Sequence, residues 1–163
     1  MNDITVLIEA LMKAHASDLK RTAYVMLGDE ALSEDVTQET FISFYKNHHQ
    51  FRGASSHKTY LYRILMNHIK MHWRKTTYLN RDALLNPDST VAFEDELVNM
   101  LDLHQALRNL KPVYGEVITL YYFNQHSVDE IAAILDISTS NVKMRLKRGR
   151  ESIKKALTGG KTL

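Results

Sequence analysis

Apolar residues recur along most of the chain at steps of three and four positions, the repeat that places side chains on one face of a helix. The first such run contains Ile4, Leu7, Ile8, Leu11, His15, Leu19, Thr22 and Met26. Gly28 follows as an expected helix stop, because glycine readily adopts the left-handed conformation that ends many helices. No segment shows the convincing two-residue alternation of a strand, so we predict an all-α fold.

Two further helices are expected in the first half of the chain. Ser33 is a good N-cap for one of them, and the acids that follow it suit the positive end of a helix dipole. Its buried stripe would contain Val36, Thr40, Phe41 and Phe44. After a polar loop at 51–57, the spacing predicts a third helix at about 56–76, with a core face made of Leu61, Ile64, Leu65, His68 and Ile69.

The last part of the chain has the signals of a helix-turn-helix. Pro112 follows a short helical stretch and suits the first turn of a helix that runs to about Phe123. Ser127 and Glu130 form a capping box for a helix ending at Leu135, and Asp136 begins a tight turn. The final helix, about 139–157, would bury Val142, Leu146 and Ile153. Two helices joined by so short a turn, the second rich in Lys and Arg, predict a DNA-binding unit.

Between these helical parts lies an acidic stretch. Residues 77–106 carry six acidic and one basic residue. The residue before Pro87 is pushed out of helical conformation, and the Asp, Ser and Thr after it favour turns. We therefore expect two small helical domains, residues 1–76 and 107–163, joined by a flexible acidic linker at 77–106 that includes some helix near 93–101.

Composition narrows the function classes. The chain has 163 residues, 44% of them apolar and 25% charged, as in a folded globular protein. With no cysteine it can form neither disulfides nor thiolate metal sites. No apolar run exceeds five residues, too few to span a bilayer, and the first residues lack the basic segment of a signal peptide. We predict a cytoplasmic location.

Positive charge is concentrated in the final helix. Residues 141–155 contain seven basic residues and one acid. Small hydrogen-bonding residues precede the cations. This order suits a recognition helix, because its first residues contact base edges and its flanks contact phosphates. The predicted DNA-binding residues are Ser138, Thr139, Ser140, Asn141, Lys143, Arg145, Lys147, Arg148 and Arg150. The alternative is a solvated basic helix face.

The third helix carries a second basic set. An aromatic ring, an amide and three cations share one face of this helix. The ring could stack on an unpaired base while the cations bind the nucleic-acid backbone. These residues are Tyr60, Arg63, Asn67, Lys70 and Arg74. The loop before them is polar and basic, as a pocket for a flipped-out base requires. Its candidate residues are Arg52, Ser55, Ser56, His57 and Lys58. The alternative is an ordinary exposed face with Tyr60 packed against a neighbour.

The second helix has a face that DNA would not bind. Asp35, Gln38, Glu39 and Ile42 line up opposite its core stripe. Because the acids repel phosphates, this face is expected to meet a protein or only water.

No chemistry-bearing pattern indicates catalysis. His68 and His72 have the four-residue spacing of paired metal ligands, but no Glu stands beside them in the usual position and no third ligand is evident. We expect no metal, cofactor, catalytic residue or small-molecule substrate.

Several motifs in this order resemble the bacterial RNA polymerase sigma factors of the extracytoplasmic-function (ECF) type, in the sigma-70 superfamily. They are Ser33-Glu-Asp-Val-Thr-Gln-Glu-Thr-Phe41, Phe51-Arg-Gly, Lys58-Thr-Tyr-Leu-Tyr-Arg-Ile64, Leu110-Lys-Pro, Glu116-Val-Ile-Thr-Leu-Tyr-Tyr-Phe123, Ser127-Val-Asp-Glu-Ile-Ala-Ala-Ile-Leu135 and Val142-Lys-Met-Arg-Leu-Lys-Arg-Gly-Arg150. Gly149 departs from the usual alanine and should cost the helix about 1 kcal/mol unless another group approaches closely.

The resemblance implies a role for each surface. The acidic face of the second helix would dock on core polymerase. The third helix and its loop would bind and melt the minus-ten promoter element, and the helix-turn-helix would bind the minus-thirty-five element. The family also implies a nucleoid-associated protein controlled by an anti-sigma factor, soluble or membrane-bound.

Two other functions stay open at this point. A stand-alone two-domain helix-turn-helix regulator would bind operators without docking on polymerase, and would leave the acidic face and the basic set of the third helix unexplained. An enzyme would use His68 and His72 to hold a metal.

Overall fold

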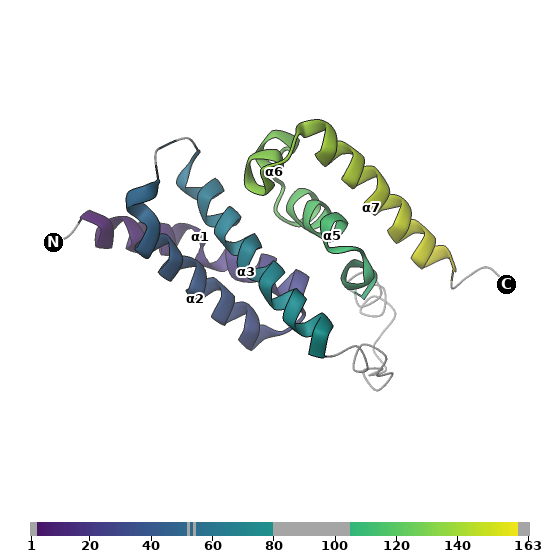
Figure 1. Cartoon of the computed structure of the whole chain (residues 1–163), viewed down its shortest axis with the longest axis horizontal. Helices are drawn as coiled ribbons and strands as arrows, with labels where there is room; N and C mark the ends of the chain where they lie inside the picture. The colour runs from purple at the N-terminus through teal and green to yellow at the C-terminus, as the bar shows by residue number, and fades with distance from the viewer. Residues whose placement is uncertain (1–2, 52, 54, 80–104, 160–163) are drawn as a thin grey trace.

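Helices account for nearly all of the chain that this computed structural model describes, which is residues 3–51, 53, 55–79 and 105–159 (Figure 1). An N-terminal bundle contains α1 (Asp3–Leu27), α2 (Glu30–Asn47), a 3-10 turn η1 (His48–Gln50) and α3 (His57–Leu79). A C-terminal bundle contains α5 (Pro112–Ile118), a π-helical turn η4 (Thr119–Phe123), α6 (Val128–Leu135) and α7 (Thr139–Gly159). The all-α prediction is confirmed. The predicted acidic linker falls mostly on residues 80–104, outside the described part.

The N-terminal core has α3 as its shared element. Leu61, Leu65 and Ile69 are fully buried against α1 and α2, as the repeat predicts. Tyr62 and Met66, one position further round the helix, are buried as well. A helix with so wide a buried arc is covered on more than one side.

The beginning of α2 corrects one prediction. Asp29, not Ser33, is its N-cap, because the Asp29 carboxylate accepts a hydrogen bond from the Leu32 amide at 2.9 Å. Gly28 lies just before it at φ 71° and ends α1, so the next helix can begin at once. Ser33 is buried inside α2, where its hydroxyl donates to the Asp29 carbonyl at 2.5 Å.

The C-terminal bundle follows its predicted signals closely. Pro112 lies in the first turn of α5. The capping box of α6 is present, with the Glu130 amide 3.1 Å from Ser127 Oγ and the Ser127 amide 3.3 Å from Glu130 Oε1. Asp136 ends α6 in the left-handed conformation at φ 56°, and α7 begins three residues later. These features build the predicted helix-turn-helix.

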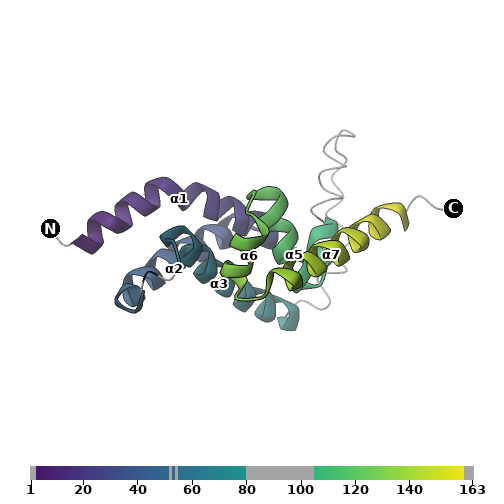
Figure 2. The ribbon, with the colours of Figure 1, turned by 90° about the horizontal axis from the view of Figure 1, so that it is seen from above.

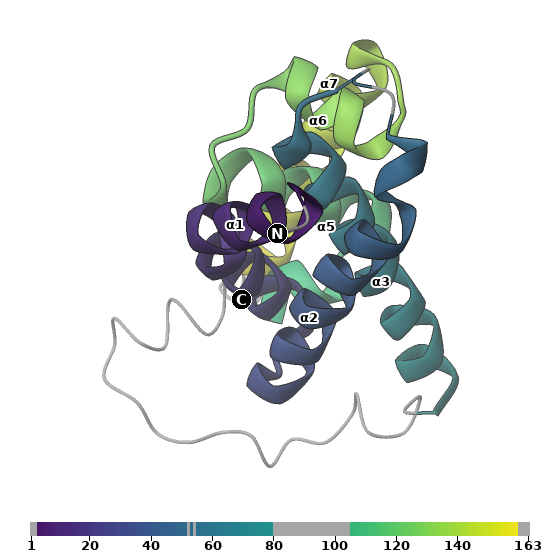
Figure 3. The ribbon, with the colours of Figure 1, turned by 90° about the vertical axis from the view of Figure 1, so that its left-hand side faces the viewer.

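The two bundles lie against each other. α6 packs along α3, and η4 contacts α1, although these elements are distant in sequence. Views from above and from the left-hand side show the same arrangement (Figures 2 and 3). The third helix therefore has α1 and α2 on one side and the C-terminal bundle on another.

Another side chain lies close to Gly149, which explains why this position of α7 has no side chain of its own. A Cβ placed there would lie 2.9 Å from Ile118 Cγ1 and 3.1 Å from its Cδ1, at the contact of α7 with α5. Gly115 offers a matched comparison, since a Cβ there would meet only the Leu107 carbonyl at 3.6 Å. Glycine at position 149 thus permits the helices to pack closely.

We predict that Gly149→Ala lowers the free energy of unfolding by about 1 kcal/mol. Overpacking costs about 1–3 kcal/mol, and the better helix propensity of alanine returns about 1 kcal/mol. Gly115→Ala, with no clash, should leave stability unchanged or raise it. Urea unfolding followed by circular dichroism measures both, and a Gly149→Ala variant as stable as Gly115→Ala would contradict the packing argument.

Candidate nucleic-acid interface

The start of α7 presents the polar residues expected of a recognition helix. Ser138 Oγ accepts a hydrogen bond from the Asn141 amide at 3.1 Å, which caps the helix. Ser138, Thr139 and Ser140 are exposed, as are Lys143, Lys147 and Arg148. The turn therefore holds this group of side chains at the surface, where a DNA groove could reach them.

Three residues of the same predicted set have partners within the protein. Arg145 is half-buried and donates from Nε to the Asn141 side-chain oxygen at 3.2 Å. Arg150 donates to the Tyr122 hydroxyl at 3.2 Å. The set thus divides into freely exposed side chains and others that are already oriented.

The aromatic residue of the third-helix set is part of a ring cluster. Tyr60 lies with its ring centroid 5.7 Å from that of Phe44 and 5.3 Å from that of Phe51, and His57 lies 4.8 Å from Phe51. Tyr60 is half-buried, so the arrangement favours the alternative in which its ring packs against neighbours. These ring contacts join Phe51, at the start of the preceding loop, to Phe44 of α2 and to the first turn of α3.

That loop is only partly described. Arg52 lies outside the described residues. Ser55 is half-buried, Lys58 is exposed, and Ser56 caps α3 by accepting a hydrogen bond from the Thr59 amide at 3.1 Å. The described loop residues and the beginning of α3 therefore lie together at one end of the N-terminal bundle.

Two cations of the third-helix set contact the C-terminal bundle. Arg63 donates to the Ala133 carbonyl at 2.5 Å, and Lys70 Nζ lies 3.0 Å from Glu116 Oε1. Asn67 and Arg74 are exposed. A hollow of about 620 Å³ between the bundles is lined by Lys70, Trp73, Arg74, Pro112, Val113, Glu116, Leu135, Ile137 and Arg145. The two predicted DNA-binding sets therefore meet at this hollow.

Glu116 has a buried carboxylate, which is costly for a charged group. Its side chain is only 1% exposed, and burial raises its pKa, while the nearby Lys70 and Arg145 oppose that rise. A buried carboxylate needs a compensating cation, which Lys70 supplies from the other bundle. The sequence pattern assigns no role to Glu116. An acidic residue among the apolar residues of a helix is nevertheless a signal, because a buried carboxylate requires a cation beside it.

The loop after η4 also reaches into the N-terminal bundle. Asn124 donates from Nδ2 to Thr22 Oγ1 at 2.7 Å and lies 3.4 Å from the Tyr62 hydroxyl. His126 stacks edge-on against Tyr62 with centroids 4.7 Å apart. Burial raises the pKa of Tyr62 to about 12 and lowers the pKa of His126. No local sequence pattern predicts these contacts, because each partner is far away in the chain.

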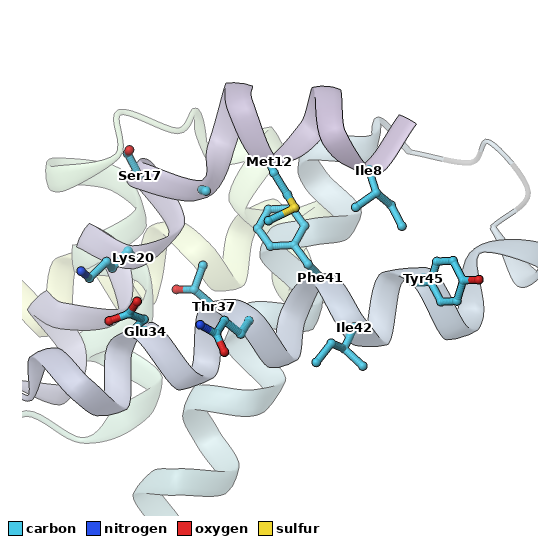
Figure 4. A pocket seen from close by; sticks show the side chains of 11 residues that line it. Ile8, Met12, Ser17, Lys20, Glu34, Thr37, Phe41, Ile42 and Tyr45 are labelled. Atoms are coloured by element: carbon cyan, nitrogen blue, oxygen red, sulfur yellow. The ribbon is translucent and has the colours of Figure 1, made fainter. Parts of the chain in front are cut away.

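The acidic face of α2 borders an apolar groove. Asp35 and Gln38 are exposed, and Ile42 is 52% exposed. The groove, about 580 Å³, runs between α1 and α2, with Met12 and Phe41 at its centre and Tyr45 at one end (Figure 4). Exposed apolar side chains beside polar ones are typical of a protein-binding surface.

Glu39, the fourth residue of that face, is turned toward α3. Its Oε2 lies 3.5 Å from His68 Nδ1 and 3.6 Å from His72 Nε2, and Ser43 Oγ lies 3.0 Å from His68 Nε2. These contacts join α2 to α3. Within the described residues, no group of three or more potential ligands is arranged to hold a metal ion.

Among the helices described, none combines the length and the apolar character needed to cross a membrane.

Comparison with known families and proteins agrees with this geometry. Residues 11–78 match the model of Sigma-70 region 2, and residues 100–153 match that of Sigma-70, region 4. The chain is 31% identical to the ECF RNA polymerase sigma factor SigW of Bacillus subtilis, over 90% of this chain and 87% of SigW. It is 33% identical to the RNA polymerase sigma factor YlaC of the same organism, over 77% and 78% of the two chains.

Two solved structures share the fold. The sigma factor RpoE, in complex with the anti-sigma factor NepR from Bartonella quintana, superimposes with a TM-score of 0.71 at 21% identity, covering 92% of this chain and 96% of RpoE. CnrH, in complex with the cytosolic domain of CnrY, gives a TM-score of 0.73 at 22% identity, covering 93% and 88%. With two region matches in family order and SigW similar along nearly its whole length, this chain belongs to the ECF sigma factors of bacterial RNA polymerase.

Proposed function

We propose that this sigma factor docks on core RNA polymerase through residues 1–76 and binds two elements of a promoter. The α2 face of Asp35, Gln38, Glu39 and Ile42, with the adjoining groove, would bind the polymerase. The third-helix set and its loop would bind the minus-ten element, and the helix-turn-helix in residues 107–163 would bind the minus-thirty-five element. The acidic segment at 77–106 would connect the two domains.

One observation carries this proposal over a stand-alone regulator. The chain has two basic sets suited to DNA and also a face of α2 that exposes Asp35 and Ile42 beside an apolar groove. A regulator that only binds operators has no use for a surface that repels phosphates and leaves Ile42 and Tyr45 about half exposed. A protein that must bind a large partner and DNA together requires both kinds of surface.

The chain would contribute binding and no catalysis. RNA synthesis would be carried out by the core enzyme, so we propose that this chain has no catalytic residues of its own. Its partners would be core polymerase and promoter DNA, without a small-molecule substrate or a cofactor. Because these partners are cytoplasmic in bacteria, we place the protein in the cytoplasm at the nucleoid.

An inhibitory protein is the third partner that we propose. The RpoE structure contains the anti-sigma factor NepR, and the CnrH structure contains the cytosolic domain of CnrY. The groove between α1 and α2 has the apolar lining that an amphipathic helix requires. An anti-sigma factor bound there, soluble or membrane-bound, would compete with core polymerase.

We predict that the purified chain forms a complex with bacterial core polymerase that lacks sigma, and that Asp35→Ala weakens this complex about tenfold, or ~1.4 kcal/mol. The carboxylate would pair with a cation on the polymerase. Asp129→Ala, which removes an exposed carboxylate from the C-terminal bundle, is the matched control and should bind normally. Fluorescence anisotropy with labelled chain measures the affinities. Absence of any complex would favour the stand-alone regulator.

We also predict that Lys143→Ala weakens promoter binding by the polymerase complex. The loss should be about 1–3 kcal/mol and specific to one base pair if Lys143 contacts a base edge. If it contacts phosphate, the loss should be smaller and the salt dependence shallower by about one unit. Lys13→Ala, an exposed lysine of α1 outside both DNA-binding sets, should change neither. Filter binding at several salt concentrations distinguishes these outcomes, and a Lys143→Ala variant equal to Lys13→Ala would remove Lys143 from the site.

A further inference from the structure

The hollow between the bundles carries more positive charge than its own acid can balance. Lys70 and Arg74 of α3 line it together with Arg145 of α7. Among the described residues that line it, Glu116 is the one acid, and its carboxylate already pairs with Lys70 at 3.0 Å. Neither Arg74 nor Arg145 forms an ion pair with another described residue. Two positive charges therefore lack a counter-ion in a concave site, where charge of one sign attracts an anion strongly.

The two guanidinium groups are suited to phosphate. Each presents N–H donors in a planar fork that matches the oxygen atoms of a phosphate group. Arg145 donates from Nε to the Asn141 side-chain oxygen at 3.2 Å, which orients its side chain and leaves the terminal N–H groups for another acceptor. Arg74 is exposed. A phosphate or diphosphate between the two arginines would supply the missing negative charge.

The other walls of the hollow are apolar. They consist of Trp73, Pro112, Val113, Leu135 and Ile137. The Trp73 indole N–H donates to the Met26 carbonyl at 3.1 Å, so the polar edge of this ring is satisfied within the N-terminal bundle. Val113 is 40% exposed, which leaves part of the apolar wall open to solvent. A flat ring can therefore lie against these side chains.

The size of the hollow limits what can fill it. Its volume is about 620 Å³, within the range of about 300–1,000 Å³ that small-molecule sites occupy. Such sites combine apolar walls with a few placed polar groups, and they are common where two domains meet. A stretch of duplex DNA is far larger, so promoter binding does not account for the hollow. Its volume, walls and charge instead match a small molecule with a flat body and at least two negative charges.

We propose that the hollow binds a nucleotide, with its phosphates between Arg74 and Arg145 and its base against Trp73 and Val113. Lys70 stays paired with Glu116 behind the ligand. The chain only binds this nucleotide, which is neither a substrate nor a cofactor. Because the walls of the hollow come from both bundles (Figure 1), a bound nucleotide contacts both of them and stabilises the arrangement in which they pack together.

The binding is tested with ADP as the probe. Trp73 is the only tryptophan of the chain, so its fluorescence reports on this site directly. Calorimetric titration gives the affinity and the stoichiometry, for which we expect one ADP per chain. Adenosine lacks the charge and inorganic pyrophosphate lacks the base, so each should bind about tenfold more weakly than ADP or worse. Absence of saturable ADP binding at millimolar concentration, or either fragment binding as tightly as ADP, would overturn the proposal.

Two arginine variants test where the phosphates lie. Arg74→Ala and Arg145→Ala each remove a phosphate partner and should weaken ADP binding about tenfold. Arg21→Ala is the matched control, because Arg21 is an exposed arginine of α1 outside the hollow, and it should bind ADP normally. Affinities of the two variants equal to that of the control would overturn the placement of the phosphates. If Arg145→Ala loses helicity in circular dichroism, the exposed Arg74 decides alone.

Val113→Asp tests the apolar wall independently of the arginines. An aspartate suits the first turn of α5, whereas its charge would repel ADP, so binding should weaken about tenfold. Val6→Asp makes the same change at an exposed valine near the start of α1 and should leave the affinity unchanged. Equal affinities of the two aspartate variants would remove ADP from the hollow. Polymerase and promoter are absent from these titrations, so their outcome is independent of the proposed function.

Discussion

The packing of α3 is the constraint on which the other surfaces depend. Leu61, Leu65 and Ile69 hold this helix in the core formed with α1 and α2. Because α3 is fixed on that side, its basic residues project in one direction, and the aromatic cluster around Tyr60 sets the base of the loop before it. The same helix also supplies the histidines that face Glu39 of α2. A change in its position would displace the acidic face of α2 and the basic residues of α3 together.

The side of α3 that faces away from α1 and α2 carries the basic residues, and its contacts are electrostatic. Two of its cations have partners in the C-terminal bundle, Arg63 at the Ala133 carbonyl and Lys70 at the Glu116 carboxylate. The buried Glu116 gains little from water and depends on Lys70 for compensation.

Much of the fold follows from local signals, and the contact between the bundles does not. Pro112, the Ser127–Glu130 capping box and the apolar repeat of α3 act within a few residues of their own positions, so the pattern predicts the helices that they build. The start of α2 shows the limit, since Asp29 and Ser33 are both good caps and only the preceding left-handed Gly28 decides between them. Thr22 and Asn124 form a bond across 102 positions, which no local period encodes. For the same reason the pattern predicts a shared face for Arg63 and Lys70 but not its cover.

The most direct test of the account is transcription in vitro with purified core polymerase, this chain and a library of templates with randomised upstream sequence. We expect transcripts that require the chain and start only on templates sharing two short elements at a constant separation, one for each bundle. Failure of the chain to direct initiation on any template, with core polymerase that responds normally to another sigma factor, would contradict it.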